Sequence, residues 1–521
     1  MPARTTDVGD VDTLLGAIRT GDADAARSVL EHCWTDLLGE EDGTALQDVQ
    51  AAVLAGDPPS VPSDLLDLVS VTRPMPTHPQ YRATNASPDE TLSGLSAFIR
   101  TANQRRAGQP GLSSATASQW LLRARNTELP QSRVLVMLQA FVSALEAGRT
   151  TEALLHAEEA YRLSISTGAS RLARAAAEAA ALALALDAQR HRAQSWIAEA
   201  CLLPSPPPWW RQTVGDPLLL ATNVALLEAS GPTGAATDSR LRDAHWAADL
   251  WFVALHLDTW HAALSPTPAV ALDGLHASLL QRSPAAHAGD VARESHRPRP
   301  IPPLLALDLG RLYLEHGRGT SAELVAELLD QEPAAHSLLT ARLCLARRRP
   351  REALAAVRNP AVAHSASPRV RIEARLLSAD AHLALGSDDD AHRELAHALD
   401  TVCRTGGSFP LRWGSPAVLR VAARLFGHPV VEELARTARE PVEPTFATLS
   451  ERQSEVLSML AQGLTATQIA RRSFVSANTV KTQVRDIYRR LGVHDRASAL
   501  RRAHETGLLD PVVRPGLRTR P

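Results

Sequence analysis

Apolar residues recur at helical spacing along most of the chain. Leu and Ala return at steps of three and four in segments such as 135–162 and 370–402, and alternating strand patterns of useful length are missing. Proline cannot continue a helix and restrains the residue before it, so proline-rich stretches predict helix ends. Such stretches occur at 57–62, 73–79, 204–208, 265–268, 297–303 and 440–444. The pattern predicts an all-α protein.

A short motif recurs between the predicted helices, in which a turn residue precedes an alanine by five positions. Its copies are Gly21–Ala26, Gly148–Ala153, Gly317–Ala322, Arg348–Ala353 and Gly386–Ala391. The last three lie 31 and 38 residues apart, on either side of the period of about 34 residues found in tetratricopeptide helix pairs. A small residue there lets two helices approach closely, and glycine suits the end of the first helix. We expect tetratricopeptide-like helical hairpins; the alternative is an irregular helical bundle.

Composition excludes several classes of enzyme. Hydrophobic residues make up 45% of the 521 and aromatic residues only 4%, while 88 alanines favour helix over strand. Of the 55 basic residues, only Lys481 is a lysine, and no Gly-rich loop precedes it. P-loop nucleotide binding, protein-kinase chemistry and pyridoxal chemistry each need a lysine in a defined setting, so all three are excluded. Because no nucleophile–base or metal-ligand spacing appears either, we predict no enzyme activity, no cofactor and no metal site.

The cysteines and the N-terminus indicate a cellular compartment. Cys33, Cys201, Cys344 and Cys403 are scattered without C-x-x-C or Cys/His spacing, which is typical of reduced cytosolic thiols. The N-terminus has no signal-peptide pattern, and no run of 18 or more apolar residues occurs. We expect a cytoplasmic protein without membrane contact.

Other conspicuous residues favour structural roles. The 19 histidines are mostly single and on polar faces. We interpret Trp209–Trp210, which follow Pro206–Pro208, as a hydrophobic plug over a helix end rather than a ligand cage. Asp388–Asp390 stand at an expected helix start, where the helix dipole favours negative charge.

Charge is distributed unevenly along the chain. Residues 445–509 contain ten basic and five acidic side chains, a net charge of +5, and residues 510–521 carry +2. The total of −2 therefore leaves −9 for the first 444 residues. An acidic body with a basic end predicts that only the end contacts a polyanion.

The C-terminal segment predicts four short helices with their own start and stop signals. Ser450 with Gln453, and Thr465 with Gln468, form capping boxes that begin the first two helices. The remaining signals are Gly463 ending the first helix, Ser476 and Gly492 bounding the third, and Asp495 beginning a fourth that ends near Gly507. Phe474 and Val475 form an apolar turn before the third helix. Four helices with this tight turn make a helix-turn-helix unit.

The third predicted helix, about 476–491, has two different faces. Its core stripe consists of Val480, Val484, Ile487 and Leu491, and its opposite face of Lys481, Thr482, Arg485 and Arg489. Such a helix fits the major groove of DNA, where Lys and Arg donate to guanine or phosphate and the threonine methyl touches thymine. A solvated charged face is the alternative.

The motifs in this segment resemble those of the LuxR-type (GerE/FixJ-like) helix-turn-helix family. They are E-V-L at 455–457, G-L-T at 463–465, I-A at 469–470, T-V-K at 479–481 and L-G-V at 491–493. The resemblance covers about 65 residues and implies sequence-specific binding of double-stranded DNA, transcriptional regulation and a homodimer on DNA through the fourth helix, with RNA polymerase as a further partner. The DNA-contacting residues that we predict are Ser476, Thr479, Val480, Lys481, Thr482, Gln483, Arg485 and Arg489.

Within that set the resemblance implies different roles. Lys481, Thr482 and Arg485 fall at base-reading positions, and Ser476 and Thr479 near phosphates. The chain departs from the family where Gln453 replaces glutamate, where Ala-Thr-Gln at 466–468 replaces Asn-Lys-Glu, and where Gln483 replaces histidine. These departures bear on phosphate contacts near the second helix.

The preceding body resembles, more loosely, the tetratricopeptide-like sensor region of MalT-like regulators. We expect it to be a sensor or an interaction platform for an unknown effector or protein. The competing hypothesis is a helical-repeat scaffold in which the helix-turn-helix is a minor DNA tether. We also consider whether the basic face folds back on the acidic body, although a free domain is the favoured state. The predicted divisions are 1–127, an N-terminal helical region with Pro-rich loops; 128–439, the tetratricopeptide-like body; 440–444, the linker; 445–510, the helix-turn-helix domain; and 511–521, a basic tail.

Overall fold

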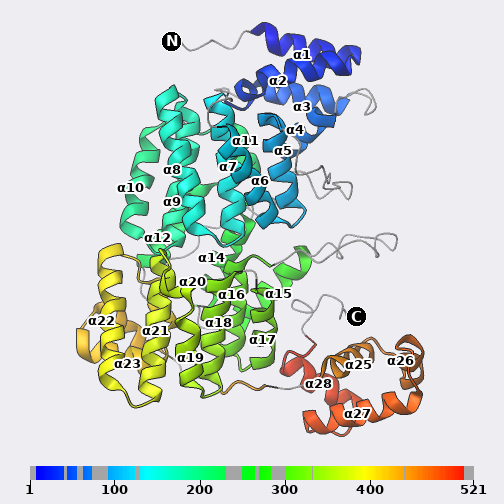
Figure 1. Cartoon of the computed structure of the whole chain (residues 1–521), viewed down its shortest axis with the longest axis vertical. Coiled ribbons are helices and arrows are strands. Elements are labelled where there is room, and N and C mark those ends of the chain that lie inside the picture. The colour runs from blue at the N-terminus through cyan, green and yellow to red at the C-terminus, as the bar shows by residue number, and fades with distance from the viewer. Residues whose placement is uncertain are drawn as a thin grey trace.

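The computed structural model describes residues 8–39, 44–55, 63–72, 92–124, 129–229, 249–263, 269–282, 301–330, 332–438, 442–446 and 449–509. Helices dominate these residues, and no strand occurs among them (Figure 1). The all-α fold predicted from the hydrophobic pattern is confirmed. Within the same residues, no helix is both long and apolar enough to cross a membrane. The predicted basic tail, 511–521, lies outside the described residues.

The helices follow one another through two stacked halves of a body (Figure 1). The first half contains α1 (Val8–Thr20), α2 (Ala23–Gly39), α3 (Thr44–Ala55), α4 (Ser63–Thr72), α5 (Gly94–Arg106), α6 (Pro110–Arg123), α7 (Pro130–Glu146), α8 (Thr150–Thr167), α9 (Ser170–Leu186), α10 (Arg190–Leu202), α11 (Pro208–Thr213) and α12 (Pro217–Ala229). The second half contains α14 (Trp251–Ala263), α15 (Ala269–Arg282), α16 (Pro303–Glu315), α17 (Gly319–Leu328), α18 (Pro333–Ala346), α19 (Pro350–Val357), α20 (Pro360–Ala363), α21 (Pro368–Ala384), α22 (Asp388–Thr405), the 3-10 helix η5 (Phe409–Trp413), α23 (Pro416–Phe426) and α24 (Pro429–Thr437).

Helical hairpins form at the recurring turn–alanine motif. All five turn residues adopt a positive φ, including Arg348 at 59° without the help of glycine. The five alanines that follow are buried. Two further copies that the sequence interpretation missed, Gly168–Ala173 and Ala188–Ala193, have the same geometry. A left-handed residue reverses the chain, and a buried alanine five positions later lets the next helix pack closely on the previous one.

Helix α9 is the centre of the first half. Every residue from Leu172 to Leu186 is buried, and the helix packs among α8, α10 and α12. Small alanine side chains permit this close approach on all sides. The two charged residues in that stretch are paired, because Arg174 Nε donates to Glu178 Oε1 at 2.7 Å, and Arg211 Nη2 donates to the same oxygen at 2.9 Å. The pair leaves no isolated charge in the core.

A continuous hydrophobic core extends through both halves, from Leu14 to Trp413. Smaller cores lie between α18 and α21 and between α21 and α24. The boundary predicted between residues 127 and 128 falls in 125–128, outside the described residues, and α5 and α6 on one side of it pack on α7 on the other. The first six helices and the hairpins therefore share one core.

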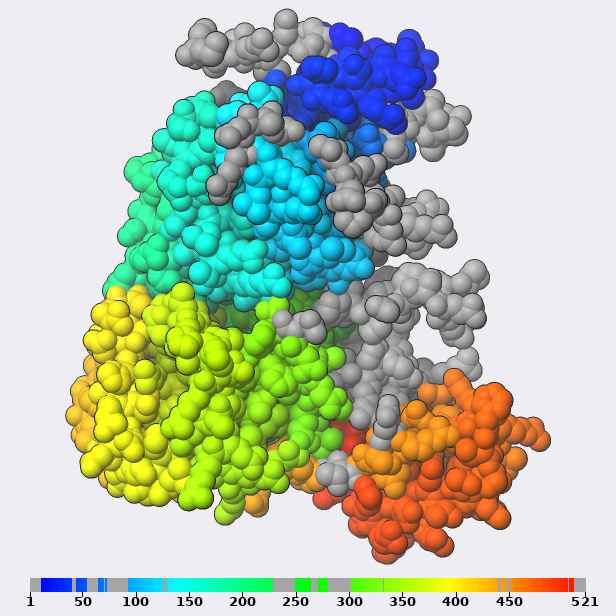
Figure 2. All heavy atoms as spheres, viewed as in Figure 1, coloured from blue at the N-terminus to red at the C-terminus, as the bar shows by residue number. Residues whose placement is uncertain are grey.

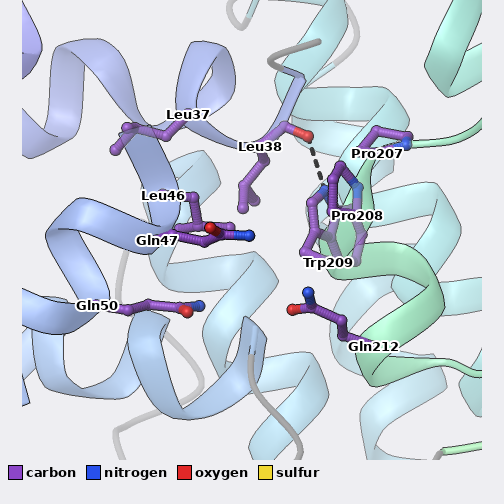
Figure 3. Close-up of a pocket in the computed structure, with 9 residues that line it drawn as sticks. All are labelled: Leu37, Leu38, Leu46, Gln47, Gln50, Pro207, Pro208, Trp209 and Gln212. Atoms are coloured by element: carbon purple, nitrogen blue, oxygen red, sulfur yellow. Dashed lines mark hydrogen bonds between the residues drawn. The ribbon is translucent and has the colours of Figure 1, made fainter. Parts of the chain in front are cut away.

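Trp209 and Trp210 form the hydrophobic plug that we expected. Both side chains are buried, and Trp209 Nε1 donates to the carbonyl oxygen of Leu38 at 2.7 Å, in the last turn of α2 (Figure 3). Gln47, Gln50 and Gln212 line the small cavity beside the ring. Its volume, about 10 Å³, has room for no more than one water molecule. The indole closes a helix end, and this cavity is too small for a ligand.

A buried charged network joins several helices of the second half, and the sequence interpretation missed it. His256 Nδ1 lies 2.6 Å from Asp308 Oδ2, and Arg311 Nη2 donates to Glu373 Oε2 at 2.6 Å. Arg342 Nε donates to the other oxygen of Glu373 at 3.0 Å. Burial lowers the pKa of His256, while the two arginines hold the pKa of Glu373 below its usual range against the effect of burial. The network fixes α14, α16, α18 and α21 together.

Candidate nucleic-acid interface

The C-terminal domain consists of the four helices that its local signals predicted. They are α25 (Glu451–Ala461), α26 (Ala466–Arg472), α27 (Ala477–Leu491) and α28 (Arg496–Glu505). Both capping boxes are present, with Ser450 and Gln453 at α25 and Thr465 and Gln468 at α26. The predicted ends are also confirmed, because Gly463 and Gly492 adopt φ values of 88° and 67°, and Ser476 and Asp495 cap α27 and α28.

The core of the domain holds α27 by one face. Val480, Ile487 and Leu491 are buried and Val484 is half-buried, as the predicted core stripe requires. The other helices contribute Val456, Leu457, Leu460, Ile469, Ala470, Ala499 and Ala503. With its apolar face fixed in this core, α27 has a defined rotation about its axis, and its opposite face points away from the domain.

That opposite face is basic and open to solvent. Lys481, Thr482, Arg485 and Arg489 are all exposed. Lys481 and Arg485 make no ion pair with any described residue, whereas Arg489 Nη2 lies 2.9 Å from Asp486 Oδ1 on the preceding turn. Two of the cations are therefore available to an incoming anion, and the third is partly compensated.

Ser476 and Thr479 form the exposed end of the same face. The Ser476 hydroxyl lies 2.8 Å from the Thr479 hydroxyl and accepts a hydrogen bond from the Thr479 backbone N–H at 3.1 Å. This arrangement places two hydroxyls beside the backbone N–H groups of the first helical turn. Helix N-termini of this kind favour phosphate groups.

Three residues differ from their predicted positions. Val480 is wrong as a DNA-contacting residue, because its side chain is completely buried in the domain core. Gln483 is half-buried and its Oε1 is enclosed without a hydrogen-bond partner among the described residues, so this side chain is turned toward the domain. Phe474, expected in an apolar turn, is 95% exposed and adopts a φ of 53°. The turn is made by backbone geometry, with only Val475 half-buried.

A linker contact joins the domain to the body; we use this name for residues 442–446 and the two turns that they touch. The Thr445 N–H donates to the Gly317 carbonyl oxygen at 2.8 Å, in the turn between α16 and α17. The ring of Phe446 packs on the main core of the body, and the guanidinium carbon of Arg347 lies 4.3 Å from the ring centroid. The sequence interpretation treated this segment as a spacer and missed the contact.

The end of the domain also touches the body. A Cβ atom at Gly507 would lie 1.5 Å from Ser321 Oγ, so the turn after α28 lies directly against α17. Figure 2 shows the domain as a lobe beside the second half of the body. The basic face of α27 stays exposed in this arrangement. The hypothesis that this face folds back on the body is therefore wrong for this structure, and so is the picture of a free domain.

Comparison with known proteins identifies the domain. Residues 447–503 match the family described as bacterial regulatory proteins, luxR family. The chain is 41% identical over 81 residues to the probable transcriptional regulatory protein NarL of Mycobacterium tuberculosis. The matched segment makes up 16% of this chain and 38% of that protein. The chain is also 37% identical over 82 residues to the HTH-type transcriptional regulator MalT of Klebsiella pneumoniae subsp. pneumoniae. That matched segment makes up 16% of this chain and 8% of that protein. No solved structure gives a significant match.

The predicted resemblance is thus confirmed where it was most specific. Residues 447–503 form a LuxR-family helix-turn-helix domain, and both a NarL and a MalT regulator are among the relatives. The chain spans well under half the length of these relatives.

Proposed function

We propose that this chain is a sequence-specific DNA-binding regulator of transcription that acts in the cytoplasm with α27 in the major groove. The observation that carries the proposal is the division of α27 into a buried apolar face and an exposed face whose Lys481 and Arg485 pair with no residue that the structure describes. A helix fixed in this way can present side chains to base edges while its scaffold stays rigid. The family of the domain and its regulator relatives support the same conclusion.

The exposed residues take different roles in this proposal. Lys481, Thr482 and Arg485 lie along the middle of α27 and read base edges. Ser476 and Thr479, at the N-terminal end of the helix, bind phosphate, as does Arg489 near its C-terminal end. Gln483 is half-buried and contributes by positioning α27 rather than by reading a base.

Charge reversal tests the DNA-binding part of the proposal. The double variant Lys481→Glu, Arg485→Glu places two carboxylates on the exposed face, and we expect it to abolish binding to a duplex that the wild-type chain binds. The control is Arg351→Glu, which changes an exposed residue of α19 in the body. Unchanged binding by the double variant would contradict the interface. Binding by the wild-type chain that ignores DNA sequence would favour the scaffold hypothesis instead.

The body, in the same proposal, positions the domain through the linker contact and binds the partner or effector that controls it. A homodimer formed through α28 then reads two half-sites, and RNA polymerase is the further partner. Support for the positioning role comes from the hydrogen bond between Thr445 and Gly317, the stacking of Arg347 on Phe446, and the packing of Gly507 on Ser321. These contacts restrict the directions in which α27 can point. A restricted domain pair favours one spacing of half-sites.

Gly319 offers a precise way to open the linker contact. It is the first residue of α17, and a methyl group there would lie 2.5 Å from Cε1 of the Phe446 ring. Gly319→Ala therefore displaces the ring without changing any residue of α25–α28. Gly16→Ala in α1 is the matched control, because nothing lies within 4 Å of its added methyl.

We expect Gly319→Ala to reduce the preference for one half-site spacing by about tenfold, since the effective concentration of the second domain depends on its restraint. Binding to a single half-site should stay the same. The measurement is a set of titrations on duplexes whose half-sites differ only in separation. If Gly319→Ala and Gly16→Ala gave the same spacing profile as the wild-type chain, the body would have no positioning role.

A further inference from the structure

A groove opens between α19, α20, α21 and α22, on the part of the body next to the linker contact. Its volume is about 260 Å³, slightly below the range of about 300–1,000 Å³ found for small-molecule sites. Leu354, Val357, Val362 and Ala374 form an apolar floor. A space of this size and lining excludes a macromolecule as the enclosed ligand and fits a small, partly apolar molecule.

Three arginines, Arg358, Arg371 and Arg375, line the same groove, against a single carboxylate, Glu394. That carboxylate pairs with Arg375, whose Nη1 lies 2.6 Å from Glu394 Oε2. The groove therefore carries two positive charges that its own lining does not compensate.

The remaining two arginines differ in how they are held. Arg371 Nη1 donates to the backbone oxygens of Ser365 and Ala366 at 3.1 Å and 2.9 Å, which fixes its position. Outside the groove lining, its charge acts to lower the pKa of the Asp187 carboxyl group against the larger effect of burial. Arg358 follows the last residue of α19 and is exposed, and its guanidinium makes no hydrogen bond or ion pair with any described residue. One guanidinium is thus preorganised, and the other is free to close on a ligand.

His382 adds an independent sign of a missing ligand. It lines the groove, and its Nδ1 is enclosed by the protein without a hydrogen-bond partner among the described residues. The closest carboxylate oxygen, Asp390 Oδ2, is 3.8 Å away, which is beyond hydrogen-bonding distance. Buried polar atoms in native proteins are nearly always satisfied, so an enclosed and unpaired ring nitrogen at a cavity calls for a partner.

We propose that this groove binds a small organic anion, with an apolar part on Leu354 and Val357 and a carboxylate or phosphate group between Arg358 and Arg371. Guanidinium groups recognise both headgroups through paired N–H donors. His382 lies eleven residues further along α21 than Arg371, so a second polar group at the other end of a longer ligand is needed to reach it. As an effector site the groove rests on the regulator function proposed above, whereas the binding itself is measured without DNA.

The position of the groove gives the bound anion a route to the DNA-binding domain. Helix α19 supplies Leu354 and Val357 to the floor, and the turn that precedes α19 carries Arg347 and Arg348. Arg347 stacks on Phe446, and Arg348 Nη2 lies 3.3 Å from Glu443 Oε1 of the linker. The ligand and the linker therefore meet the two ends of one short helix.

Calorimetric titration of the full chain tests the site with four probes: hexyl phosphate, hexanoate, hexan-1-ol and inorganic phosphate. We expect measurable binding of at least one of the two amphiphilic anions, at least about tenfold tighter than that of hexan-1-ol or inorganic phosphate. The stronger of the two anions identifies the headgroup. Equal binding of the alcohol, or no binding of either anion, would overturn the proposal.

Three variants locate the binding. Arg358→Ala removes the free cation and Ala374→Leu fills the apolar floor, and each should weaken the anion about tenfold or more. Arg351→Ala removes an exposed arginine of α19 that lies outside the groove and should leave binding unchanged. Circular dichroism checks that helix content is retained. Loss of binding in Arg351→Ala to the same extent as in Arg358→Ala would show nonspecific charge attraction and contradict the site. Because no DNA is present, these outcomes are independent of whether α27 binds a duplex.

Discussion

Lys481 is the residue on which the base-reading role can be tested most simply. It is the single lysine of the chain, lies in the exposed face of α27 and makes no ion pair with any described residue. Lys481→Ala should remove about 1–3 kcal/mol of discrimination between the preferred duplex and a scrambled one. Arg489→Ala should instead weaken both duplexes alike and reduce the salt slope by about one unit, because its proposed partner is phosphate. Titrations of both duplexes at several salt concentrations measure the two effects.

The pairing of Arg489 with Asp486 makes the second variant a useful control. The ion pair is exposed, so breaking it costs little stability. Equal losses on both duplexes for Lys481→Ala, matching the pattern expected of Arg489→Ala, would contradict a base contact by the lysine.

Asp380 predicts a pH effect in the body. Burial raises the pKa of its carboxyl group to about 6, although a hydrogen bond from the Ser415 hydroxyl lowers it. The folded chain therefore keeps this proton between about pH 4 and pH 6, where the unfolded chain has lost it. The stability that this group contributes is present below about pH 4 and is lost as the pH rises through about 6, by about 3 kcal/mol.

Asp380→Asn retains an acceptor for Ser415 and removes the titration. We expect the melting temperature of the variant, relative to that of the wild-type chain, to rise between about pH 4 and pH 7. The other carboxyl groups affect both proteins alike, so their contributions cancel in the difference between the two melting temperatures. Melting-temperature curves that stayed parallel across that range would show that ionisation of Asp380 does not destabilise the folded chain.

At the scale of elements, the N-terminus of α27 links stability to DNA binding. Ser476 caps the helix by accepting a hydrogen bond from the Thr479 N–H. Ser476→Ala should cost about 1 kcal/mol and speed amide exchange in α27 about fivefold. Ser476→Asp keeps a side-chain cap but places a carboxylate where phosphate is expected. It should therefore preserve exchange protection while weakening DNA binding. If Ser476→Asp bound DNA as tightly as the wild-type chain, the proposed contact between a DNA phosphate and the N-terminus of α27 would be contradicted.

Local signals explain why the C-terminal helices could be predicted from the sequence. Ser450 and Thr465 act on residues three positions away, and Gly492 ends α27 through its own backbone angle. Such signals need no knowledge of the rest of the fold. The same helical periodicity places Val480 in the core stripe, and its complete burial shows that the periodicity is a better guide to this residue than its position within the stretch of predicted DNA contacts.

Contacts between residues far apart in sequence could not be predicted in this way. His256 and Asp308 meet across 52 positions, and neither carries a local signal for the other. Gly319 belongs to no sequence motif, yet its missing side chain makes room for Phe446. Both pairings follow from tertiary packing that a single sequence does not reveal.

At the scale of the whole molecule, the charge division now has a spatial meaning. The first 444 residues carry about −9 and residues 445–509 carry +5. The domain is attached through its linker and the turn after α28, while the exposed face of α27 is left open. This attachment leaves the basic face accessible to a polyanion. Because charges separated by more than about 8 Å are screened at physiological salt, the position of α27 matters more than the net charge of the body.

Selection from a random duplex library by the full chain tests the central claim most directly. The claim is that the exposed face of α27 reads DNA sequence as part of a dimer. We predict enrichment of a two-fold symmetric site whose half-sites lie about one helical turn apart. In a parallel selection, Lys481→Ala should relax the preference at one position in each half-site. Recovery of duplexes with no common sequence, by a chain whose binding responds to salt alone, would contradict the account.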